Sequence, residues 1–143
     1  MAHMPTAELV RQGHTRFERV VAHEIPGSPG RHTYETQVTF LDKTNLIPLE
    51  KGHGYSVYLI PRGGPDGTKA SIRWTVHIPP PGIRDPRSGV VDRQITMTEA
   101  GAYGRETRIG WQFDGAWQMI AGAWKIEIEI DGIAWETLDF TAR

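Results

Sequence analysis

The chain has 143 residues, which fits one domain that can bury a core without disulfides or metals to hold it together. It contains no cysteine, which excludes disulfides, cysteine-ligated zinc, iron–sulfur clusters and thiol catalysis. The formal net charge of −1 gives no electrostatic reason to expect a nucleic acid partner. We expect no membrane insertion either, because no apolar run approaches the roughly 20 residues that a membrane helix needs.

We expect residues 1–12 to be an N-terminal lead-in and residues 13–143 to form a single β-sandwich domain. His3-Met4 is typical of a cloning remnant, so part of the lead-in is foreign to the domain. The first residues also lack the basic-then-apolar pattern of a signal peptide. The compartment stays open: cytoplasmic by default, periplasmic if a signal peptide was removed.

Alternating apolar residues predict a series of short strands separated by turns. The expected strands cover 13–25, 33–41, 55–60, 68–78, 91–97 and 103–113, with a turn at 26–30. The strand at 55–60 is apolar on both faces and should be central. The strand at 68–78 should carry Ala70, Ile72, Trp74 and Val76 on its inward face. In the strand at 91–97, the side chains in one register are Val91, Arg93, Ile95 and Met97. Residues 79–89 have no periodicity and form the longest irregular segment.

A final hairpin is predicted by strict alternation of apolar and charged residues from Trp124 to Asp131. Asp131-Gly132 then suits a two-residue turn, because both residue types tolerate positive φ. We expect Trp74, Trp124 and Trp135 to lie in the core.

Regular pairing of this hairpin would place Asp139 against the core, where an unpaired carboxylate costs several kcal/mol. One extra residue in the second strand removes the conflict, because a slip by one residue moves all later side chains to the other face. We therefore predict a β-bulge at Glu136-Thr137, with Leu138 opposite Ile126 and Phe140 opposite Trp124. Leu138 and Phe140 should both be buried and Asp139 exposed.

These elements predict an all-β fold, an antiparallel immunoglobulin-like β-sandwich of about seven to nine strands. No amphipathic helix longer than one or two turns is visible in the sequence.

Several landmarks also resemble the bacterial domain-of-unknown-function family numbered 3859, over roughly residues 13 to 141. The landmarks are Thr44, Ile47-Pro48, Gly52, the segment Pro80 to Gly89, Trp111, Trp117 and Gly122-Ala123-Trp124. The chain departs from the family pattern at His53 and at Ile120-Ala121. The resemblance implies a β-sandwich and brings no known activity, ligand or catalytic residue.

The candidate partner-binding residues are Arg84, Asp85 and Arg87 in the proline-rich segment, together with Trp117. Arginine suits carboxylate and phosphate groups, and a stiff loop loses little entropy on binding. In the alternative interpretation the segment is a rigid connection in which Asp85 pairs one arginine, and Trp117 plugs one end of the sandwich.

The sequence predicts no catalytic residue and no metal or other cofactor. The six histidines are scattered, without the His-x-x-x-His spacing of a helical zinc site. No Gly-x-Ser-x-Gly elbow occurs, and Glu127 with Glu129 alternates with isoleucines on the wet face of a strand.

We therefore expect a non-catalytic binding or protein-interaction module whose partner is an unknown protein or a small ligand. One alternative is a structural or assembly subunit that pairs through an edge strand, with a homodimer as one possible outcome. The other is a small metal-dependent hydrolase that uses histidines and carboxylates of the end loops.

Overall fold

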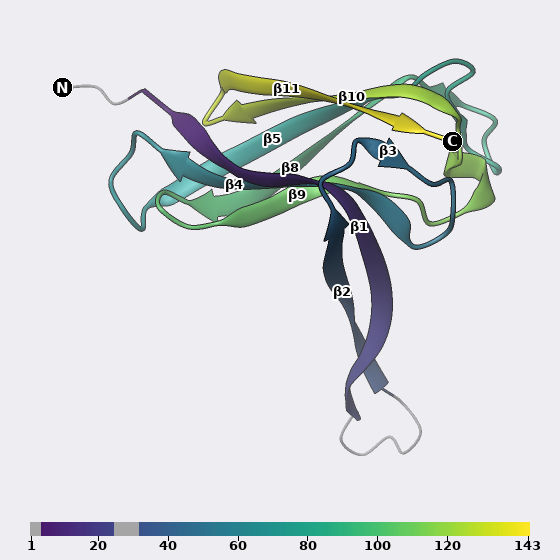
Figure 1. Ribbon diagram of the computed structural model, residues 1–143, viewed down its shortest axis with the longest axis horizontal. Coiled ribbons are helices and arrows are strands. Elements are labelled where there is room, and N and C mark those ends of the chain that lie inside the picture. Colours follow the sequence, from purple (N-terminus) through teal and green to yellow (C-terminus); the bar gives the residue numbers. More distant parts are fainter. Residues whose placement is uncertain (1–3, 25–31) are drawn as a thin grey trace.

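The computed structural model describes the backbone of residues 4–24 and 32–143 and the side chains of residues 4–19 and 35–143. Two antiparallel sheets pack face to face as a β-sandwich (Figure 1), which confirms the predicted fold class. The described residues include no helix that is long and apolar enough to cross a membrane.

The first sheet has four strands in the order β2-β1-β4-β9. They are β1 (Thr6–Glu24), β2 (His32–Asp42), β4 (His53–Arg62) and β9 (Thr107–Gln112). The apolar strand expected at 55–60 is indeed central, because β4 pairs with both β1 and β9.

The second sheet has five strands in the order β3-β11-β10-β5-β8. They are β3 (Leu46–Ile47), β5 (Lys69–His77), β8 (Gln94–Ala102), β10 (Gly122–Ile130) and β11 (Ile133–Ala142). A small hairpin of β6 (Ile83–Arg84) and β7 (Val91–Asp92) and a single 3₁₀ turn, η1 (Ala116–Gln118), complete the elements. β3 pairs with β11 in parallel, and the other pairings are antiparallel.

An aromatic stack fills the core between the sheets. The Phe140 ring lies between Tyr55, at 4.8 Å between ring centroids, and Trp124, at 5.6 Å. Phe113 meets Trp124 edge-on at 5.4 Å. All four side chains are at most 1% exposed, so both sheets depend on this stack.

Several boundaries differ from the prediction. Residues 6–12 are not a separate lead-in, because they form the first part of β1 and pair with β4. The strand expected at 91–97 is divided into β7 and β8, so that Val91 and Arg93 are exposed while Ile95 and Met97 are half-buried. Arg93 instead donates from Nε to the Ile78 carbonyl, at 3.1 Å. The turn expected at 26–30 lies outside the described residues.

The terminal hairpin has the predicted two-residue turn, with positive φ at Asp131 (48°) and Gly132 (81°). Leu138 opposes Ile126 and Phe140 opposes Trp124, as predicted, and Asp139 is exposed. Phe140 is buried as expected, whereas Leu138 is only half-buried.

The bulge in that hairpin lies one residue earlier than predicted. Ala134 pairs with Glu129 and Glu136 pairs with Ile128, so the extra residue is Trp135. Trp135 is consequently half-buried at the margin of the core rather than within it.

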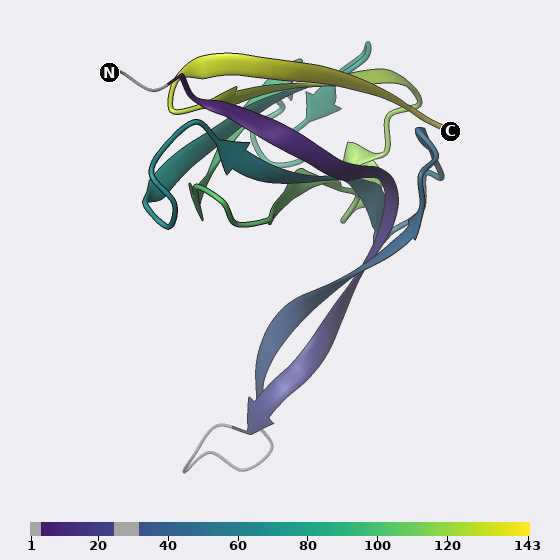
Figure 2. The same cartoon turned by 60° about the vertical axis from the view of Figure 1, so that its left-hand side comes forward.

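The largest departure from a simple sandwich is a two-stranded arm (Figures 1 and 2). The first part of β1 pairs with β4, from Thr6 to Arg16, and the last part pairs with β2, from His14 to Glu24. Beyond Arg16 the pair β1–β2 leaves the body and projects from it. Among the described elements, β1 is the only one that β2 contacts extensively.

Candidate functional site

The proline-rich segment begins where β5 ends and is held to the body by apolar residues. Pro79 is buried and Ile83 is 2% exposed, which anchors the β6–β7 hairpin at the end of the sandwich. Gly82 is needed here: its φ is 86°, and a Cβ would lie 2.7 Å from the carbonyl oxygen of Asp92. The exposed part of the hairpin is therefore held in place by these buried residues.

Asp85 shapes the hairpin and does not pair with an arginine, which corrects one interpretation of the sequence. Its Oδ1 accepts hydrogen bonds from the backbone N–H groups of Arg87, at 2.7 Å, and Ser88, at 3.1 Å. These bonds hold the pKa of the Asp85 carboxyl below its usual range, with Ser88 as the larger cause. Asp85 is thus a turn-forming residue.

The two arginines remain available to a partner. Arg84 donates from Nη1 to the Gly89 carbonyl at 3.3 Å. No acidic side chain pairs with Arg84 or Arg87 among the described residues. Both residues are exposed and no ion pair engages them in the described chain, while Asp85 and Asp92 balance their charge over the hairpin as a whole.

Trp117 lies beside this hairpin and is 47% exposed, so it does not plug the sandwich. It belongs to η1, which contacts β6 directly. Gly115 allows the indole to lie back over the backbone, since a Cβ there would be 2.7 Å from Trp117 Nε1. The structure therefore brings Trp117 next to the arginine hairpin, as the sequence alone could not show.

The hairpin also carries exposed apolar residues that the sequence analysis did not single out. Val90 is 58% and Val91 is 41% exposed, and Val91 is paired with Arg84. We call the five residues Arg84, Arg87, Val90, Val91 and Trp117 the end-loop surface.

A cleft of about 310 Å³ opens between the two sheets next to η1. Its lining combines aromatic, apolar and polar side chains from β1, β5, β8, β9 and η1, among them Phe17, Trp74, Trp111, Arg108, Glu99 and Gln118. Trp74 and Trp111 are each only 7% exposed, so the cleft offers little aromatic surface for a ligand to stack on. Trp74 Nε1 donates to the Gly110 carbonyl of the opposite sheet at 3.1 Å, which closes the sandwich at this edge.

A second hollow, of about 460 Å³, lies beside the start of the proline-rich segment. There His77 Nε2 is 2.8 Å from Glu127 Oε1, a distance short enough for an ion pair. The same nitrogen is buried and has no hydrogen-bond partner of acceptable geometry among the described residues, so the contact is an ion pair only when the imidazole is protonated. Arg93 and Lys125 also line this hollow, and no serine or threonine does.

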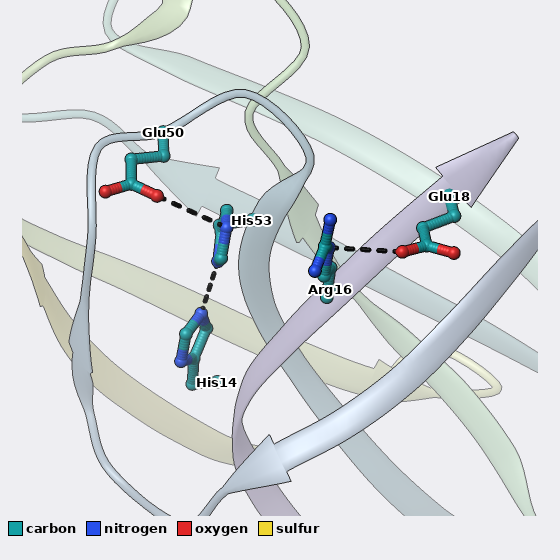
Figure 3. Close-up of polar contacts among 5 residues, drawn as sticks. All are labelled: His14, Arg16, Glu18, Glu50 and His53. Atoms are coloured by element: carbon teal, nitrogen blue, oxygen red, sulfur yellow. Dashed lines mark hydrogen bonds and ion pairs between the residues drawn. The ribbon is translucent and has the colours of Figure 1, made fainter.

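Two histidines meet at the root of the arm, a pairing that the sequence analysis missed (Figure 3). His14 Nε2 and His53 Nδ1 are 2.7 Å apart, with stacked rings, and His53 Nε2 is 3.4 Å from Glu50 Oε2. Burial is the main cause that lowers the pKa of His14, and His53 lowers it further, against the carboxylates of Asp42 and Glu50. A neutral His14 suits the hydrogen bond between the rings.

The described residues contain no group of three or more histidine, cysteine, aspartate or glutamate side chains arranged to hold a metal ion. The pair of His14 and His53 is hydrogen-bonded within this arrangement.

Comparisons with known proteins place the fold and nothing finer. No model of a known protein family matches the chain, so the resemblance to family 3859 is not confirmed, and no curated protein matches either. The chain is similar to the crystal structure of an immunoglobulin-like protein, PA1606, from Pseudomonas aeruginosa. Identity is 13%, the match covers 90% of this chain and 96% of that one, and the TM-score is 0.59.

A weaker match is the alkylpurine DNA glycosylase AlkC of Pseudomonas fluorescens, solved with DNA containing an abasic site analog. It has 10% identity and a TM-score of 0.45, and covers 69% of this chain and 28% of that one. That similarity is too low to carry an argument. The chain is thus an immunoglobulin-like β-sandwich with a bacterial structural relative.

Proposed function

We propose that the chain is a non-catalytic protein-interaction module and that it binds its partner through the end-loop surface. One observation carries the proposal: the hairpin with Arg84 and Arg87 contacts the turn that bears the exposed Trp117. Tryptophan and arginine are the residue types most enriched where binding energy concentrates at interfaces. Loops on a rigid sandwich are also the usual position for binding residues.

The chemistry of the surface suggests the kind of partner. The two guanidinium groups suit carboxylates, and Arg can bind one in a bidentate manner. Val90, Val91 and Trp117 suit an apolar or aromatic side chain between those carboxylates. We infer that the partner presents an acidic segment with at least one large apolar residue, and that no cofactor, nucleic acid or membrane insertion is involved.

Selection of peptides from a random displayed library tests this directly. We expect the chain to enrich acidic peptides with an apolar residue, and the triple variant Arg84→Ala, Arg87→Ala, Trp117→Ala to lose them. The variant Lys69→Ala, Arg73→Ala is a matched control, because it removes two exposed positive charges from β5. Equal enrichment by the triple variant and the parent chain would refute the end-loop surface as the binding site.

A small hydrolase is the competing function, and the hollow with His77 and Glu127 is the place where it would act. Among the described residues no serine, threonine or cysteine lines it, and the contact between His77 and Glu127 lies on the solvent-facing side of the second sheet. Hydrolysis of an ester or peptide substrate that His77→Gln abolishes would favour the enzyme over the binding module.

The family assignment remains part of this proposal. Membership of family 3859 is consistent with the sandwich, and it would add no ligand or activity to the argument above.

A further inference from the structure

The arm exposes an edge strand whose projecting part lacks the usual protection against pairing. Among the described elements β2 pairs only with β1. A bulge at Leu41 interrupts β2 at the root, and the nine residues 32–40 continue without one. The sequence of β2, HTYETQVTFLD, contains no proline, glycine, lysine or arginine. Proline, lysine and bulges are the devices by which proteins keep edge strands from adding another strand.

The other edge strands of the two sheets are β9, β3 and β8. β9 has only six residues, and its Gly110 carbonyl accepts the Trp74 indole N–H, while β3 has only two residues. β8 has nine residues and also lacks proline and lysine, but it is supported by a five-stranded sheet. The free edge of β2 differs from all three because it belongs to a two-stranded ribbon.

The composition of β2 favours its own copy as the pairing partner. The six residues Thr36 to Leu41 have no charge and are rich in β-branched and aromatic side chains. Segments of this length with high β propensity and low charge pair with identical segments, because no like charges meet. A second copy of β2 can therefore pair with the free backbone groups of this edge, and a different protein is not required.

The arm also needs further support. A two-stranded ribbon without a sheet or helix behind it is marginally stable in water at best. The root is well anchored: Phe17 is 7% exposed and lies under the guanidinium of Arg108, and buried Thr15 is hydrogen-bonded to Ser56. The part of β2 beyond the root has no such cover, since Glu35, Thr36, Gln37 and Thr39 are exposed.

We propose that two copies of the chain associate by antiparallel pairing of their β2 edges about a two-fold axis. The two arms then form one four-stranded ribbon, β1-β2-β2-β1. In antiparallel pairing the two bodies lie at opposite ends of this ribbon. The arm is long enough to keep them apart, because the eight residues 32–39 of β2 that project from the body span roughly 26 Å. This surface is separate from the end-loop surface and does not depend on it.

Lysine substitutions on the edge provide the first test. In the dimer, Glu35→Lys with Gln37→Lys places four positive charges together. Within one arm residue 37 faces Glu18, so the new lysine there meets an opposite charge. We expect sedimentation to show a dimer for the parent chain and at least a tenfold weaker dimer for this variant. Thr96→Lys with Thr98→Lys puts the same charges on β8, the other long edge strand, and should leave the dimer intact.

A charge-reversed edge distinguishes pairing from loss of folding. The variant Gln37→Glu, Thr39→Glu should also be monomeric alone, and should form a mixed dimer with the lysine variant. Circular dichroism of each variant controls for folding. A monomeric parent chain, or a dimer that only the β8 variant disrupts, would overturn the proposal.

Cysteine cross-linking gives an independent measurement, because the natural sequence has no cysteine. At the two-fold axis one residue opposes its own copy, at a distance that a disulfide can span, whereas its neighbours oppose other residues. The single variants Gln37→Cys, Val38→Cys and Thr39→Cys should therefore yield a covalent dimer at one of these positions. Thr98→Cys on β8 should yield none, and cross-linking of the β2 variants no faster than this control would refute the pairing.

Discussion

Two single-residue deletions in β11 should have opposite consequences, because the bulge can absorb one of them and not the other. Deleting Trp135 leaves Ala134 opposite Glu129 and Glu136 opposite Ile128, which are the pairs already present. The strand becomes regular, and every later side chain keeps its face. The loss is then the half-burial of one indole, about 1–2 kcal/mol.

The Asp139 deletion is made in the chain that already lacks Trp135, so that no bulge remains to absorb it. Phe140 then moves opposite Lys125 and leaves the core. Phe140 is 1% exposed and stacked between two rings, so its removal costs about 3–5 kcal/mol.

Thermal unfolding separates the two outcomes. At about 2–4 °C per kcal/mol for a domain near this size, the Asp139 deletion should lower Tm by roughly 10 °C or more, and the Trp135 deletion by about 2–8 °C. Near-ultraviolet circular dichroism should retain the signal of the buried tryptophans only in the Trp135 deletion. Equal Tm values, or greater damage from deleting Trp135, would show that the bulge does not set the phase of the strand.

Three further outcomes follow from side-chain contacts. Burial and the hydrogen bond to Asp131 raise the pKa of Tyr103 to about 12, so the associated stability is present below pH 10 and is lost as the pH rises towards 12. Asp131→Asn should make this tyrosine titrate earlier by ultraviolet absorbance, and an unchanged curve would contradict the contact. The pKa of His14 is lowered, so chemical unfolding should show stability decreasing as the pH falls below about 6.5; His14→Gln should flatten that slope. Replacing Arg84 and Arg87 together by alanine should leave Tm nearly unchanged, and a decrease of several degrees would mean that the hairpin needs them structurally.

The strands of the body could be predicted because alternation with a period of two identifies a buried face without reference to any partner strand. The inward residues of β5 and the turn at Asp131-Gly132 follow from local chemistry alone. The need for a bulge in β11 was also visible, since Asp139 and Phe140 cannot both be on the correct face without it. Its position was wrong by one residue because an extra residue at either place restores the same phase.

The candidate site could not be predicted, because it is formed by contacts between residues far apart in sequence, which the alternation of apolar residues does not reveal. Trp117 and Arg84 are far apart in sequence, and the contact between η1 and β6 appears only in the folded chain. His14 and His53 belong to different strands and meet because β1 and β4 pair in one particular register. The arm escaped prediction for a related reason: the pattern of β1 shows which side chains share a face, but not that its two halves pair with different strands.

The two proposed surfaces differ in how well the rest of the fold supports them when no partner is bound. The end-loop surface rests on buried Pro79 and Ile83, and its arginines are exposed whether or not a partner is present. The β2 edge, by contrast, leaves backbone donors and acceptors without a strand to pair with, on a ribbon that is weak alone. Pairing between two copies would satisfy those groups and strengthen both arms at once, so association and arm stability should rise together with concentration. The end-loop surface would then be presented twice, once at each end of the ribbon, which would favour partners with repeated acidic segments over single ones.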